Sequence, residues 1–285
     1  MSTVVLFGAT GFLGRQVRLL LSEDPRADRL VCPGRAELDL LAATPADVAG
    51  LLRFTRPSVV VNCVGRMSGG HDELLRGNAG VTALLLDAIA AVAPGARYVR
   101  LGSAAEYGPG EPGRSQHEDD PARPTSPYGI SHLAGTLMVE QAGAVDGVSL
   151  RLFNLVGPGV STENVLGRAR ELLRTASGHL DLGPLGAMRD FVDVRDVADA
   201  VVRAAFAREL PARVINVGSG RAVPVREAVT LLTAVAGFTG EVRESAPEHS
   251  RSRAVSWSQA DIGRAWRVLG WRAGTPLADS VKAMV

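Results

Sequence analysis

The chain has 285 residues, 46% of them hydrophobic, which is enough for one large domain or for a domain with a smaller lobe. A formal net charge of +1 argues against nucleic acid or an anionic membrane surface as the main partner. Cys32 and Cys63 stand alone without metal-ligand spacing, so we expect a reducing compartment and no metal site. We find no charged leader and no apolar run long enough to cross a bilayer, and we expect a cytoplasmic protein.

The N-terminal stretch predicts a strand, a glycine-rich turn and a helix in direct succession. Residues 4–7 are apolar, residues 8–14 read GATGFLG, and residues 15–21 suit a helix. The first glycine permits a tight turn, the second lets the backbone approach a pyrophosphate, and the third lets the helix pack closely on the strand. A plain strand-to-helix turn is the alternative. We place these residues in a dinucleotide site: Gly8, Thr10, Gly11, Phe12, Leu13 and Gly14.

A second short strand over residues 30–32 is followed by a loop that bears on the choice of cofactor. An acidic residue near this point usually binds the ribose 2′-OH of NAD, whereas arginine suits the 2′-phosphate of NADP. Arg35 therefore favours NADP, with NAD as the second choice, unless it is an ordinary solvated loop arginine. Asp39 and Leu40 follow and are placed to flank the adenine.

Helices and strands then alternate as far as residue 153. We expect helices over 45–54, 72–93 and 128–141, and strands that begin at residues 58, 97 and 148. The strand at 58 runs into a small-residue turn, Cys63-Val64-Gly65, at the carboxyl edge of the sheet, where ligands bind. Asn78 inside the second helix either forms hydrogen bonds or faces solvent. The loop over 109–127 is long enough to be functional or mobile.

Past residue 155 the alternation becomes less regular. We expect helices over 163–176, 195–207, 225–236 and 275–284, and strands over 189–194 and 214–218. The pattern predicts an α/β fold, a doubly wound parallel sheet with a smaller C-terminal lobe. Residues 1–155, completed by parts of 189–220, form the dinucleotide-binding domain. Residues 156–285 form mainly the substrate-binding lobe, with the active site in the cleft between them.

Six motifs occur in order along the chain: Gly8-x-x-Gly11-x-x-Gly14, Ser103-Ala104-Ala105-Glu106-Tyr107-Gly108, Tyr128-Gly129-x-Ser131, Arg151-x-x-Asn154-x-x-Gly157-Pro158, Arg189-Asp190-Phe191-Val192 and Asn216-Val217-Gly218-Ser219-Gly220. Together they resemble the extended short-chain dehydrogenases/reductases, the NAD-dependent epimerase/dehydratase family, over nearly the whole chain. Within that family the stretch from Glu37 to Asn78 looks most like nucleotide-sugar reductases such as the dTDP-4-dehydrorhamnose reductases and GDP-fucose synthases.

The resemblance implies roles for residues of both sites. Tyr128 would exchange a proton with a substrate oxygen, Ser103 would hydrogen-bond the same oxygen, and a nicotinamide would exchange hydride with the carbon. A packing tyrosine and a capping serine are the alternative. Leu101, Phe153, Tyr128 and His132 would contact the cofactor. The substrate-side residues would be Ala104, Glu106, Asn154, Arg189 and Arg251, although Arg189 could instead form a surface ion pair with Asp190 or Asp193.

The chain departs from the family at His132, where the family has a lysine that lowers the pKa of the tyrosine. Histidine is mostly neutral near pH 7 and lowers that pKa less. We expect an NAD(P)-dependent reductase or epimerase that acts on a nucleotide-linked sugar or a natural-product intermediate. A cofactor-binding protein with little catalysis and a non-redox elimination or cyclisation enzyme are the alternatives. The resemblance also implies a homodimer through the helices at 72–93 and 128–141.

Overall fold

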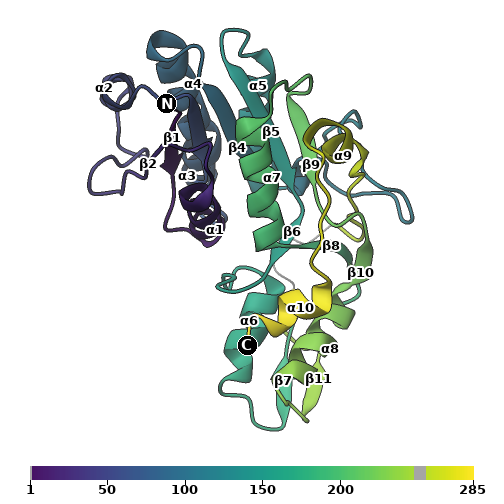
Figure 1. The fold of residues 1–285 in the computed structure, drawn as a ribbon. Helices are drawn as coiled ribbons and strands as arrows, with labels where there is room; N and C mark the ends of the chain where they lie inside the picture. Colours follow the sequence, from purple (N-terminus) through teal and green to yellow (C-terminus); the bar gives the residue numbers. More distant parts are fainter. Residues whose placement is uncertain (1, 247–254) are drawn as a thin grey trace.

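The computed structural model describes residues 2–246 and 255–285, and its centre is a six-stranded parallel sheet in the order β2-β1-β3-β4-β5-β9 (Figure 1). The strands are β1 (Thr3–Phe7), β2 (Arg29–Val31), β3 (Val59–Asn62), β4 (Arg97–Ser103), β5 (Asp146–Leu152) and β9 (Val214–Val217). All neighbouring strands pair in parallel. All six carboxyl ends therefore lie at one edge, and the predicted fold class is confirmed.

Helices cover both faces of this sheet because alternate residues of each strand point to opposite sides. Val4 and Leu6 belong to one core, which α1 (Phe12–Glu23) and α7 (Val194–Phe206) cover. Val5 and Phe7 belong to the other core. That second face is covered by α2 (Pro45–Thr55), α4 (Val81–Val92) and α5 (Pro127–Gln141), and α9 (Gly263–Leu269) packs beside β9.

The helix predicted over 72–93 runs from His71 to Val92 but is not uniform. It consists of α3 (His71–Leu74), a wider π-helical turn η1 (Leu75–Gly80) and α4. By length and composition these 22 residues could cross a membrane, which corrects the expectation that no such stretch exists. Half of the most apolar 18-residue stretch of this helix is buried within the protein, and the helix packs against α2 and α5. Its apolar composition is what a core helix needs.

The smaller lobe has its own sheets and its own core, and Figure 1 shows it below the main sheet. Its strands β6 (Asn154–Val156), β8 (Met188–Asp193) and β10 (Ala222–Pro224) form a three-stranded sheet, and β7 (His179–Asp181) pairs with β11 (Glu241–Arg243). Its helices are α6 (Val165–Leu173), α8 (Val225–Val235) and α10 (Leu277–Lys282).

Residues 189–220 are divided between the smaller lobe and the main sheet. The strand predicted at 189–194 exists as β8, but it pairs with β6 and β10 of the small sheet. Only β9 joins the main sheet, and α7 packs against α1. Asp193 ends β8 and caps α7 by accepting a hydrogen bond from Arg195 N at 2.8 Å. The chain therefore passes directly from the small sheet back to the main layer.

The long loop predicted over 109–127 follows a short 3₁₀ helix, η2 (Ala104–Glu106). It is fastened to the segment near residue 259, because Gln116 N donates to Gln259 O at 2.7 Å. Asn216 Nδ2, at the end of β9, donates to Gln116 O at 2.8 Å. These bonds fix the loop between the main sheet and the C-terminal segment.

Candidate active site

The glycine turn between β1 and α1 has the geometry that close backbone packing requires. Gly8 has a φ of +76°, and a Cβ on it would lie 2.8 Å from the carbonyl carbon of Cys63. A Cβ on Gly14 would lie 2.0 Å from Gly8 O, so only glycine allows this contact between helix and strand. Gly11 is exposed and begins α1 without a side-chain cap, which leaves first-turn amide groups available to an anion. The turn therefore fits the pyrophosphate of a dinucleotide.

The other residues predicted in this turn and at the end of β3 differ in exposure. Thr10 and Gly65 are exposed, whereas Phe12, Cys63 and Val64 are partly buried. Leu13 is buried in the core, as Gly14 is, and Leu101 near the end of β4 is partly buried. Gly8 lies against Cys63 and Val64. The structure therefore brings the ends of β1 and β3 together at one edge, although Leu13 serves packing.

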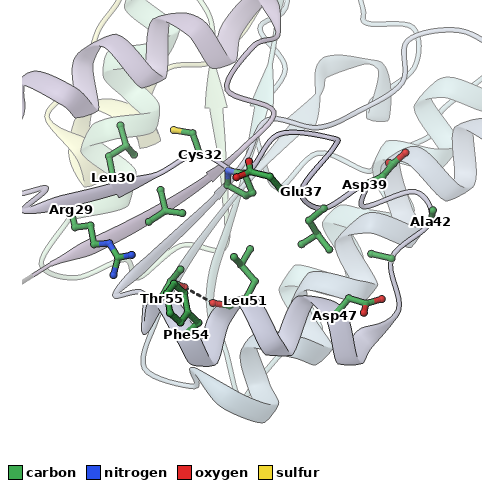
Figure 2. A pocket seen from close by; sticks show the side chains of 14 residues that line it. Arg29, Leu30, Cys32, Glu37, Asp39, Ala42, Asp47, Leu51, Phe54 and Thr55 are labelled. Atoms are coloured by element: carbon green, nitrogen blue, oxygen red, sulfur yellow. Dashed lines mark hydrogen bonds between the residues drawn. The ribbon is translucent and has the colours of Figure 1, made fainter.

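An open pocket of about 810 Å³ lies beside the end of β2, between the following loop and α2 (Figure 2). Asp39 lines it, but Leu40 is only 6% exposed and packs in the core instead. The Arg35 side chain is 81% exposed, and its Nε lies 3.9 Å from Asp39 Oδ2. Glu37 folds back, and its Oε2 accepts a hydrogen bond from Gly34 N at 2.7 Å. An acid and an arginine thus both lie near the end of β2, the point where a dinucleotide's ribose is recognised.

Ser103, Tyr128 and His132 come from two adjoining elements. Ser103 ends β4, and its Oγ accepts a hydrogen bond from Ala105 N at 3.2 Å. Tyr128 lies in the first turn of α5, and its ring centroid is 4.5 Å from that of His132, one turn along the same face. A Cβ on Gly129 would lie 2.4 Å from Ala105 O, so glycine lets α5 begin directly against η2.

His132 is buried and uncharged. It is 8% exposed, and its Nδ1 has no hydrogen-bond partner among the described residues. Burial lowers the pKa of His132 well below its usual value, and the positive charge of Arg100 lowers it further. The expectation of a neutral histidine near pH 7 agrees with this. Tyr128 therefore faces a histidine that does not become charged around neutral pH.

Glu106 does not take the position predicted for it on the substrate side. Its side chain is fully buried, and Oε1 accepts hydrogen bonds from Ser103 N at 2.9 Å and Thr136 Oγ1 at 3.0 Å. Its Oε2 accepts from Arg151 Nε at 2.8 Å. Both oxygens are engaged by the protein, so Glu106 holds Ser103 in place and offers nothing to a substrate.

The remaining substrate-side residues lie where the main sheet meets the smaller lobe. Asn154 is partly exposed, and its Nδ2 donates to Asp190 O at 3.3 Å. Ala104 is partly buried against the pair formed by Tyr107 and Phe153, and Phe153 is 4% exposed. The Phe153 side chain is therefore part of a packed cluster.

Arg189 is buried, and its guanidinium donates to Met188 O at 2.9 Å and Val255 O at 2.8 Å. The carboxylates suggested as its surface partners have other contacts, since Asp190 accepts from Ser219 and Asp193 from Arg195. Arg251 lies outside the described residues. Within the described residues, no group of three or more His, Cys, Asp or Glu is arranged to hold a metal ion.

Of the two alternatives for Asn78, the structure supports hydrogen bonding, although its partners, among them Ser131, were not predicted. Asn78 is buried in the π-helical turn, its Oδ1 accepts from Arg66 N at 2.8 Å, and its Nδ2 donates to Ser131 Oγ at 2.9 Å. Asn78 therefore connects the segment after β3 to the helix that carries Tyr128. An asparagine inside an apolar helix was the sequence signal, and the wider turn is a feature often found at functional sites.

Comparisons with known proteins give one consistent result. The NAD dependent epimerase/dehydratase family matches residues 4–218. A dTDP-6-deoxy-L-talose 4-dehydrogenase (NAD(P)(+)) from Kitasatospora kifunensis is 39% identical over 99% of this chain and 94% of its own. The solved structure of RMD from Pseudomonas aeruginosa with NADPH superposes with a TM-score of 0.85 at 24% identity, covering 99% of this chain and 96% of that one. The solved structure of MoeE5 with UDP-glucuronic acid and NAD superposes with a TM-score of 0.83 at 26% identity, covering 99% of this chain and 97% of that one.

The glycine turn predicts a variant that folds but does not bind a dinucleotide. Gly11 has an extended backbone, and a Cβ there would approach only Gly8 O, at 3.3 Å, so Gly11→Val should keep the fold. Its side chain would occupy the space in front of the helix terminus, and we expect calorimetry to show no binding of NAD⁺ or NADP⁺. Gly95→Val, at a position with open space, is the control. Undiminished binding by folded Gly11→Val would place the dinucleotide elsewhere.

Burial of neutral His132 predicts that the stability of the protein depends on pH. The unfolded chain binds a proton at this residue near pH 6.5, whereas the folded chain does not, so stability is fully present above that pH and falls below it. We expect wild type to lose up to about 1.4 kcal/mol per pH unit relative to His132→Gln below pH 6.5. Denaturant unfolding at several pH values measures this difference. His71→Gln, at an exposed helix start, is the control, and parallel wild-type and His132→Gln curves would contradict the prediction.

Proposed function

Since this chain belongs to the NAD-dependent epimerase/dehydratase family, we propose that it oxidises or reduces carbon 4 of a dTDP-linked 6-deoxyhexose. It is an NAD(P)-dependent enzyme of the extended short-chain dehydrogenase type that acts on nucleotide sugars. The observation that carries the finer proposal is the 39% identity with a dTDP-6-deoxy-L-talose 4-dehydrogenase over 99% of the chain. Such a reaction belongs to the assembly of modified sugars for natural products.

The chain's own residues divide the work between binding and proton transfer. The glycine turn and the segment after β3 would hold the dinucleotide, which, when bound, accepts or donates a hydride. Tyr128 would take the proton from the hydroxyl at carbon 4 during oxidation and return it during reduction. Ser103 would hydrogen-bond the same oxygen. His132, whose Nδ1 has no hydrogen-bond partner within the described part of the chain, would form a hydrogen bond with a ribose hydroxyl.

On the substrate side we propose Asn154 and Ala104 beside the sugar, and Arg189 near the diphosphate with Arg251 as a second cation. Asn154 and Ala104 are partly exposed near the junction of the two layers, which supports this placement. Arg189 already donates to two backbone carbonyls, so it also fixes β8 to the segment at Val255. Its loss should therefore disturb the lobe as well as the substrate.

We also propose that the protein is a cytoplasmic homodimer. Four large apolar side chains remain 38–51% exposed on the turn η1 and on α5, two elements that pack against each other. Burying them against a second copy would stabilise a dimer. They are Leu75, Ile130, Leu137 and Met138.

The proposed reaction is tested by the formation of reduced nicotinamide from dTDP-6-deoxy-L-talose and from the matching UDP- and GDP-linked sugars. We expect the dTDP-linked sugar to have the highest kcat/KM. Tyr128→Phe should lower kcat by about 10²- to 10⁴-fold, the usual contribution of a proton-transfer group. Tyr98→Phe removes a hydroxyl that contacts Asn62 in the core and serves as the control.

Two results would change the proposal. Cofactor binding without turnover of any sugar would favour a binding protein. Formation of reduced nicotinamide that survives in Tyr128→Phe would remove Tyr128 from the proton transfer.

Arg35 predicts a preference for NADP over NAD. Its exposed side chain near the end of β2 is free to meet a 2′-phosphate, so Arg35→Ala should weaken NADP⁺ binding roughly tenfold and leave NAD⁺ binding unchanged. Arg53→Ala, on the outside of α2, is the control. If wild type binds NAD⁺ more tightly, the carboxylate of Glu37 is the selecting group, and Glu37→Gln should then weaken NAD⁺ binding.

A further inference from the structure

Arg100 places a guanidinium in the interior of the main sheet. It is 1% exposed, although strands buried on both faces are normally apolar throughout. Its Nε donates to Thr82 Oγ1 at 3.0 Å and its Nη2 to His132 O at 2.9 Å. Its Nη1 donates to Thr136 Oγ1 at 2.9 Å and to Ser149 Oγ at 2.8 Å. All four hydrogen-bond partners are neutral, so they satisfy the donors and leave the charge in place.

Two glycines make room for this guanidinium. A Cβ on Gly135, one turn after His132 in α5, would lie 2.4 Å from Arg100 Nη2. A Cβ on Gly102 would lie 3.3 Å from Arg100 Nη1. Glycine is unfavourable inside a helix, so Gly135 lowers the stability of α5 but leaves the space that the guanidinium occupies. The cation is bonded to the backbone of α5 at His132 O, one turn after Tyr128.

Arg100 has no carboxylate of its own. The nearest carboxylate oxygen in the described part of the chain, Glu106 Oε1, is 3.8 Å from Arg100 Nη1, but Glu106 is bonded more closely to Arg151 at 2.8 Å. Two guanidiniums therefore share one carboxylate, and the groups that hydrogen-bond Arg100 are all neutral.

We propose that Arg100 is a positioning residue that supplies, from β4, the fixed positive charge that favours the phenolate of Tyr128. The inference rests on the proposed role of Tyr128 as the proton-transfer group. The charge of Arg100 explains why position 132 can hold a neutral residue, because a cation at position 132 on α5 would be repelled by Arg100 on β4. The other titratable groups that interact with Arg100 are buried: Tyr98, Glu106, His132 and Arg151.

The ionisation of these groups agrees with the proposal. Burial lowers the pKa of Arg100, whereas Glu106, Tyr98 and Tyr128 act to raise it and Arg151 lowers it further. The interaction between Arg100 and Tyr128 is reciprocal. If a phenolate at Tyr128 stabilises the charged form of Arg100, then charged Arg100 stabilises the phenolate of Tyr128 to the same extent.

The chain has three tyrosines, which makes a direct test feasible without any substrate. Burial raises the pKa of Tyr98, and that of Tyr107 to about 12, so the first tyrosinate to form on raising the pH should be that of Tyr128. Near-ultraviolet absorbance follows it, and its disappearance in Tyr128→Phe assigns it. Arg100→Gln, which keeps a hydrogen-bonding side chain without the charge, should move this transition up by about one pH unit.

Arg97→Gln is the matched control. Arg97 is a second buried arginine of β4, at the first residue of the strand and paired with Asp146 at 2.7 Å, and its loss should not move the Tyr128 transition. Arg100→Lys and the double variant Arg100→Met/His132→Lys each retain one cation and should titrate near wild type. Circular dichroism over the same pH range confirms that each variant stays folded.

An unchanged transition in folded Arg100→Gln would overturn the proposal. If Arg100→Gln does not fold, a rise of about one pH unit in the double variant, where His132→Lys should replace the charge, would overturn the proposal equally. A shift in the titration together with no turnover of any nucleotide sugar would leave the electrostatic role standing and reject the proposed function. In an active enzyme, Arg100→Gln should move the ascending limb of the oxidation rate to higher pH, whereas a purely structural role would lower kcat equally at all pH values.

Discussion

The carboxylate of Glu106 connects the three elements on which the functional edge of the sheet depends. It accepts hydrogen bonds from Ser103 N at the end of β4, from Thr136 Oγ1 on α5 and from Arg151 Nε on β5. A buried carboxylate is tolerated only when charged and polar partners surround it, so these elements are held in one relative position. Ser103 and the turn that carries Tyr128 consequently reach the same edge as the glycine turn.

The features that could be predicted from the sequence depend on short-range patterns. The spacing of Gly8, Gly11 and Gly14 specifies a local backbone path, and the alternation of helices and strands specifies a parallel sheet. The predictions that the structure corrected concern features that depend on long-range contacts. A motif fixes the position of Glu106 along the chain, but only the folded neighbours decide that its side chain points inward. Likewise, β8 has the composition of a core strand, and its pairing with β6 and β10 decides which sheet it joins.

Arg100 and Asn78 show why the rest of the site could not be predicted. The hydrogen-bond partners of Arg100 come from β5, α4 and two turns of α5, and no local pattern announces that they converge. Asn78 reaches Ser131 because the helix widens to a π-helical turn over residues 75–80, which shifts the faces of the helix relative to a regular one. Asn78 was visible as a polar side chain in an apolar helix, which marks a site without defining its contacts, whereas Arg100 lies in a strand that carries a second arginine, Arg97.

The neutral residue at position 132 and the buried cation at position 100 are best understood as one arrangement. A lysine at 132 would combine two tasks, contact with a bound ribose and positive charge near the phenol. In this chain the tasks are separable: His132 offers an uncharged nitrogen, whereas Arg100 is held by four neutral partners and cannot move toward the cleft. A charge fixed in the sheet is screened much less than one at the surface and does not depend on the order of a flexible side chain. It is therefore in place whether or not a dinucleotide is bound.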